Sequence, residues 1–140
     1  MPDLVTGLSR AVLQTAFERS PVGVGVCDED GRFLAVNSAL TSMLNRRREE
    51  IVGRPFLTFV HPEQRSASLA GYFRSVVAAA SVSPPATEHA ELRCLSGDES
   101  VVWLSVTWTI TEPDRAGEQY GIVHLRDVTD RRHAGAHVGA

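Results

Sequence analysis

The chain has 140 residues, the usual length of one domain, and its apolar share of 43% is high enough to build a buried core. Its net charge of −3 gives no electrostatic reason to expect nucleic-acid binding. The sequence has no apolar run of the roughly 18 residues that a membrane span needs, and its N-terminus lacks the features of a signal peptide. We therefore expect a cytoplasmic protein that binds neither nucleic acid nor membrane.

The first elements are a helix and a strand hairpin. Residues 4–19 carry apolar side chains at helical spacing, which predicts an amphipathic helix that ends at Ser20-Pro21. Val22 to Cys27 alternates valine with glycine, which predicts a strand whose glycines allow the N-terminal helix or a ligand to come close. The segment "DEDGR" predicts the turn, with Asp30-Gly31 as its central pair, and Arg32 to Val36 the returning strand.

Several helices follow the hairpin. Asn37 and Ser38 have the side chains that begin helices, directly before "ALTSMLN". Residues 49–52 predict a short helical turn that Gly53 ends. A longer helix is expected over about residues 63–80, with Pro62 near its first turn and with Tyr72 and Phe73 on its buried face.

The last third of the chain predicts three more strands, over residues 87–95, 101–111 and 120–128, joined by the polar turns "SGDES" and "EPDRAGEQ". Residues 129–140 are polar and rich in Gly and Ala, which is typical of a linker. Consecutive hairpins indicate an α+β fold, an antiparallel sheet with helices on one face.

Four segments, in this order and spacing, make the sequence resemble the PAS domain family over about residues 12–132. They are "FERSPVGVGVCDEDGRFLAVNSAL", "EEIVGRPFLTFVHPEQ", "SGDESVVWLSVTWTIT" and "GIVHLRDVTDRR". The resemblance implies a five-stranded antiparallel sheet, with helices on one face that enclose a small pocket. It implies sensory or docking work in signalling proteins of bacterial type, and not catalysis.

The resemblance also implies a division of the chain. Residues 1–19 would be an amphipathic cap or dimerisation helix, residues 20–128 the PAS domain, and residues 129–140 a linker to an output domain outside this sequence. In "DVTDRR", Asp127 and Thr129 would tie the end of the last strand to a neighbouring loop, where the signal leaves.

Strand alternation together with the resemblance predicts the residues that face the pocket. They are Leu92, Leu104, Val106, Val123 and Leu125 from the strands and Tyr72 and Phe73 from the long helix. This wall is apolar, so two interpretations stay open: a filled core without ligand, or a pocket for an apolar small molecule such as a fatty acid.

Flavin, haem and metals are not expected. Flavin-binding members of the family have amide side chains where this chain has Leu92, Leu104 and Leu125, and their photoreactive segment is missing. Residues 63–80 contain no His to ligate haem, and the spacing of His61, His89 and His124 does not suggest a zinc site. Cys27 and Cys94 form no CxxC motif and are interpreted as buried free thiols.

The outer face of the sheet carries an apolar residue that needs a cover. Trp103 points away from the pocket by alternation, as does Ile122. The N-terminal helix, through Leu4, Leu8 and Val12, would cover this face in its own chain or in a partner. The resemblance implies a homodimer through this helix and the sheet, and packing within one chain is the alternative.

Two other function classes stay open. Curved sheets packed on helices also occur in small pocket enzymes, but the inward positions lack Asp, Glu and His, and Asp28 to Asp30 is explained by turn formation. No catalytic residue is proposed. A ligand-free module for protein–protein interaction and dimerisation is the main alternative to a sensor.

Overall fold

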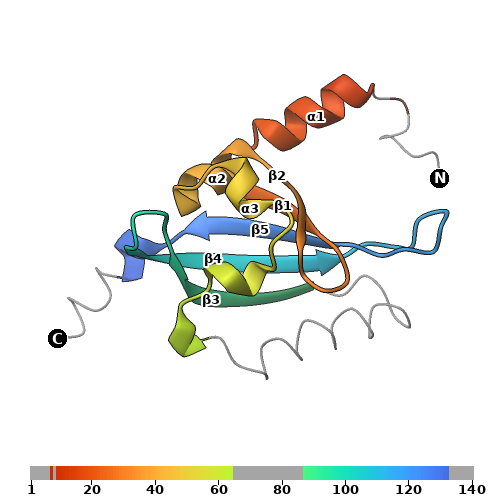
Figure 1. The fold of residues 1–140 in the computed structure, drawn as a ribbon. Helices are drawn as coiled ribbons and strands as arrows, with labels where there is room; N and C mark the ends of the chain where they lie inside the picture. The colour runs from red at the N-terminus through yellow and green to blue at the C-terminus, as the bar shows by residue number, and fades with distance from the viewer. Residues whose placement is uncertain (1–6, 8, 65–86, 133–140) are drawn as a thin grey trace.

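A computed structural model describes residue 7 and residues 9–64 and 87–132 of the chain. Five strands form one sheet, with short helices beside it (Figure 1). The strands are β1 Gly23–Cys27, β2 Phe33–Val36, β3 Thr87–Leu95, β4 Val101–Ile110 and β5 Gly121–Asp127. The helices are α1 Arg10–Glu18, α2 Ser38–Leu44, α3 Arg48–Ile51 and the 3-10 helices η2 Phe56–Phe59 and η3 Pro62–Gln64.

The sheet has the order β2-β1-β5-β4-β3, and every neighbouring pair is antiparallel. The first hairpin therefore lies beside the last strand, and the connection from β2 to β3 passes across the sheet. This arrangement confirms the predicted α+β fold with a five-stranded antiparallel sheet.

Strand boundaries agree with the sequence predictions to within one residue. The N-terminal helix does not, because it begins at Arg10 and not at residue 4. Ser9 is extended and its side-chain oxygen accepts a hydrogen bond from the Val12 amide, so Ser9 is the N-cap. Leu4 and Leu8 lie outside the described residues, as do most of the predicted helix over residues 63–80 and both Tyr72 and Phe73.

The turn between β1 and β2 is built by the side chain of Asp28. Its Oδ1 accepts hydrogen bonds from the amides of Asp30 and Arg32, at 2.9 and 3.0 Å. Gly31 has a φ of +81°, a backbone conformation that residues with a side chain rarely adopt. Turn formation therefore explains the acidic run, as the sequence predicted.

The core lies between one face of the sheet and the helices. Side chains alternate between buried and more exposed along β1 and over most of β4, as expected for a sheet with one covered face. Helices α2, α3 and η2 cover that inner face with Leu40, Leu44, Ile51, Phe56 and Phe59, all buried. The ring of Phe33 packs against those of Phe56 and Phe59, with centroids 5.8 and 6.2 Å apart.

The two glycines of β1 make room for the Phe33 ring of β2 and for Leu40 of α2, and not for the N-terminal helix. A Cβ at Gly25 would lie 2.7 Å from the Phe33 ring, and a Cβ at Gly23 would lie 3.1 Å from the Leu40 Cα. The sequence predicted a close approach here but gave it the wrong partner. The small residues let the start of α2 pack directly on the strand.

Candidate functional site

The five strand residues predicted to face the pocket are buried in the structure. Leu104, Val106 and Leu125 are fully covered, and Leu92 and Val123 are at most 7% exposed. They belong to the same apolar core as the Phe33, Phe56 and Phe59 rings. The inward orientation predicted by alternation is therefore present, whereas a ligand-binding role for these residues remains a prediction.

A small cavity lies near the turn between β1 and β2. Its volume is about 20 Å³, which is room for about one water molecule. Of the five predicted wall residues on the strands, Val123 lines it. The other lining residues are Cys27, Asp28, Glu29, Gly31, Phe56, Trp108, Ile110 and Gly121.

The chemistry available at this cavity is limited. Burial, with a smaller contribution from the Asp28 carboxylate, raises the pKa of the Cys27 thiol to about 12. Burial likewise raises the pKa of Cys94 to about 12, so both thiols are neutral and poor nucleophiles at neutral pH. Within residues 9–64 and 87–132, no three His, Cys, Asp or Glu side chains gather to hold a metal ion.

The clearest polar site joins α1 to the rest of the domain through Asn37. Its side-chain nitrogen donates to the carbonyls of Phe17 and Val22, at 2.9 and 3.0 Å. Its side-chain oxygen accepts from the amides of Val24 and Leu40, at 2.9 and 3.0 Å. The sequence predicted the cap on α2, and the structure adds the tether to α1 and β1.

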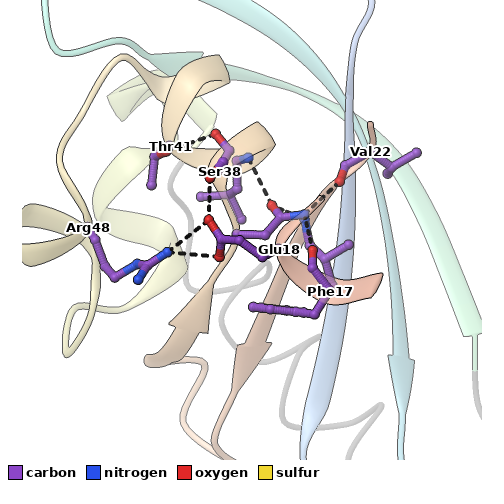
Figure 2. A network of polar contacts seen from close by, with 9 residues as sticks. Phe17, Glu18, Val22, Ser38, Thr41 and Arg48 are labelled. Carbon is purple, nitrogen blue, oxygen red and sulfur yellow. Dashed lines mark hydrogen bonds and ion pairs between the residues drawn. The ribbon is translucent and has the colours of Figure 1, made fainter. Parts of the chain in front are cut away.

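A second set of contacts fixes the end of α1 (Figure 2). Both carboxylate oxygens of Glu18 accept from the same Arg48 nitrogen, at 3.0 and 3.2 Å, and Glu18 also accepts from the Ser38 hydroxyl. Arg48 begins α3, so the run "NRRREE" contributes a contact between helices as well as a solvated helix end. The sequence contained no signal that would pair Glu18 with Arg48 across 30 residues.

An open groove of about 770 Å³ lies beside α1, which sequence reasoning did not predict. It is lined by Gln14, Phe17, Glu18, Leu34, Ala35, Val36, Arg48, Glu49 and Val52. Leu34 and Val52 are 48% and 37% exposed, and none of the residues in α1 is buried. The exposed apolar side chains of Val12 and Leu13 lie on the same helix.

The predicted exit residues fasten the end of β5 to a strand and not to a loop. The Trp103 amide of β4 donates to the Thr129 hydroxyl oxygen at 3.0 Å, and the Val128 amide donates to the Trp103 carbonyl at 2.9 Å. Asp127 accepts from the Thr129 amide and so shapes the turn. A helical turn over residues 129–132 follows.

Within its own chain, Trp103 is covered by two arginines and not by the N-terminal helix, whereas cover by a partner's helix stays a prediction. The guanidinium of Arg132 lies over its ring, 4.2 Å from the centroid, and that of Arg93 lies at 5.9 Å. The described part of the N-terminal helix projects beyond the β2 edge, while Trp103 is on β4 (Figure 1). Val12 is 50% exposed there, so α1 does not cover this face of its own sheet.

Both ends of the domain meet the sheet at the same end. Gly23, at the start of β1, pairs with Leu125 near the end of β5, because the two strands are antiparallel neighbours. The tether of α1 at Asn37 and the exit at Thr129 therefore lie at one end of the sheet, while the small cavity lies toward the other.

A five-stranded antiparallel sheet, with short helices on its inner face and segments fastened at both chain ends, defines a PAS-type α+β domain. This chain belongs to the PAS family: the family model described as "PAS fold" matches residues 17–133. PAS domains are typical of sensory and signalling proteins and are generally not enzymes. No helix among the described residues is long and apolar enough to cross a membrane.

Solved structures show the same fold. The PAS domain of an HTR-like protein from Haloarcula marismortui is 23% identical, with a TM-score of 0.67 over 84% of this chain and 89% of that one. A PAS domain from a two-component sensor histidine kinase is 15% identical, with a TM-score of 0.63 over 84% and 99%. The PAS domain of a LuxR-family transcriptional regulator from Burkholderia thailandensis, in complex with ethanol, is 18% identical, with a TM-score of 0.61 over 82% and 96%. Among curated proteins, none matches this sequence.

Proposed function

We propose that this PAS domain is a cytoplasmic sensory unit that regulates a linked output domain through its two chain ends. The observation that carries the proposal is that α1 and the exit turn are both fastened by side chains at one end of the sheet. A change in the core would shift β1 and β5 against each other, and both ends would move with them.

The proposed unit acts as a homodimer. Helix α1 exposes Val12 and Leu13, and the groove beside it exposes Leu34 and Val52. A second copy of this chain would cover these apolar side chains and exclude them from water. The groove is also bordered by Glu18, Arg48 and Glu49, which would form the polar rim of such an interface.

The proposed ligand is a small apolar molecule, held by burial and not by specific polar contacts. The ligand would bind at the cavity near Cys27, whose lining is mostly apolar. The solved PAS domain from Burkholderia thailandensis is in complex with ethanol, which has three non-hydrogen atoms, so a ligand of that size would need this cavity to widen. A fatty acyl chain would need far more room than about 20 Å³, so it would have to extend beyond this cavity.

A ligand-free interaction module is the second candidate. The small size of the cavity favours it, because a core packed by Phe33, Phe56 and Phe59 needs no further molecule to fill it. In that case the same chain ends and the same dimer would transmit a signal that arrives at the surface.

Native mass spectrometry of protein purified from its host separates the two candidates. A sensor with a resident ligand gives a second mass that disappears on denaturation, and the difference identifies the molecule. A single mass that equals the bare chain, after mild purification and at several collision energies, would contradict the ligand and favour the interaction module.

A further inference from the structure

The outer face of the sheet holds charged side chains that reach across from the end of the chain. Glu91 of β3 accepts a hydrogen bond from the Arg132 Nε at 2.8 Å and another from Arg131. Its side chain is 21% exposed. Burial would raise the pKa of Glu91, but the two guanidinium groups outweigh that effect and hold the pKa below its ordinary value, so the carboxylate is ionised at neutral pH.

Arg132 also contacts an aromatic ring. Its guanidinium lies 4.2 Å from the centroid of the Trp103 ring while its Nε bonds Glu91. Glu91 and Trp103 stand on neighbouring strands, because Glu91 pairs with Ser105 and Arg93 pairs with Trp103. One arginine therefore bridges β3 and β4 on the face away from the core.

These contacts hold the first turn after the sheet. The Arg132 amide donates to the Val128 carbonyl at 2.9 Å, and Thr129 is bonded to the Trp103 amide. The backbone of residues 129–132 and its two arginine side chains are thus fixed to the same part of the sheet. Nothing in the helical turn alone would direct it across β3 and β4.

We propose that Glu91, Trp103, Arg131 and Arg132 form an exit latch, which fixes the direction in which the chain leaves the sheet and opens as a unit. Exposed ion pairs and a cation–π contact are individually weak, so together they favour the closed turn by roughly ten- to thirtyfold. A change in β3 or β4 that shifts the equilibrium between the closed and the open turn by the same factor would release the turn. The role of the latch in signalling rests on the proposed function, but its existence does not.

Amide hydrogen exchange of the intact chain, followed by mass spectrometry, tests the latch without any output domain. Glu91→Gln removes the charge that holds both arginines, and exchange of the amides at residues 128–132 should become about three- to tenfold faster. Glu112→Gln is the matched control, because it removes the same charge from an exposed residue just after β4, at the end of the sheet away from residues 128–132. It should leave exchange at residues 128–132 as in the unaltered chain.

Two further measurements keep the result decisive. Raising the salt concentration from about 0.05 to 0.5 M should speed exchange at residues 128–132 of the unaltered chain, because the ion pairs are exposed enough to be screened. The charge swap Glu91→Arg with Arg132→Glu should restore part of the protection. Unchanged exchange in Glu91→Gln, or an equal change in the control, would overturn the latch. If Glu91→Gln exchanges faster throughout the chain, the substitution has destabilised the whole domain. The salt response of residues 128–132 in the unaltered chain then decides whether the latch exists: faster exchange at high salt supports it, and unchanged exchange overturns it.

Discussion

The side chain of Asn37 joins α1, β1 and α2. It is fully buried, and each of its two polar atoms bonds two backbone groups, in α1, before β1, in β1 and in α2. An amide is the side chain that serves here, because it has two donors on one atom and two acceptor positions on the other. The asparagine was recognisable in the sequence as a helix cap, but the tether depends on where the fold brings Phe17 and Val22.

Asn37→Ala should lower the free energy of unfolding by about 2–4 kcal/mol, because four backbone groups lose their partner in a largely buried site. Asn37→Ser keeps a hydroxyl that can cap α2 but cannot reach the Phe17 carbonyl, so an intermediate loss is expected. Urea unfolding at constant pH measures both. If Asn37→Ser were as stable as the unaltered chain, the tether to α1 would contribute nothing and the cap would be the whole role of Asn37.

Two glycines on neighbouring strands should respond in opposite directions to the same substitution. A Cβ at Gly25 would meet the Phe33 ring at 2.7 Å, so Gly25→Ala should destabilise the domain by about 1–3 kcal/mol. A Cβ at Gly121 would lie 3.8 and 3.9 Å from Ile110 and Cys27, in ordinary contact beside the small cavity. Gly121→Ala should therefore stabilise it by about 0.5 kcal/mol.

The same urea titration measures this pair, each variant against the unaltered chain. A loss of stability in Gly121→Ala would mean that the cavity lining cannot accept a methyl group.

At the level of elements, the strands were predictable because burial of one face imposes a period of two on the sequence. Leu104, Val106, Val123 and Leu125 face the core as alternation indicated. The antiparallel order followed from the short turns. The position of the first hairpin beside β5 was not derivable from alternation, because period-two patterns do not specify which strands are neighbours.

The contacts at the two chain ends were the least predictable part. An apolar stripe on α1 shows that the helix needs a cover, but not where that cover lies. Trp103 was correctly placed on the outer face, yet its cover proved to be arginines, one from β3 and one from the exit turn. Pairs such as Glu18–Arg48 and Glu91–Arg132 join residues 30 and 41 positions apart, which only the folded arrangement of helices and strands brings together.

At the level of the whole molecule, the amphipathic helix α1 leaves Val12 and Leu13 exposed among the described residues. Val12 is 50% exposed and Leu34 is 48% exposed, and both belong to the region of α1 and its groove. An isolated surface leucine is ordinary, but several beside one open groove favour an interface. The guanidinium groups of Arg132 and Arg93 already cover the Trp103 ring in the middle of the sheet. A second copy of the chain would therefore bind better at α1 and the groove than at the middle of the sheet.

Sedimentation of the intact chain should therefore show a dimer whose dissociation constant rises at least about tenfold in Leu34→Glu, since a carboxylate cannot be buried there without loss. Deletion of residues 1–18 should weaken it at least as much, because α1 is removed. Val101→Glu is the matched control, since Val101 is 40% exposed at the start of β4, away from the groove. A monomer at high concentration of the intact chain would rule out the dimer, and equal weakening by Val101→Glu would place the interface elsewhere on the sheet.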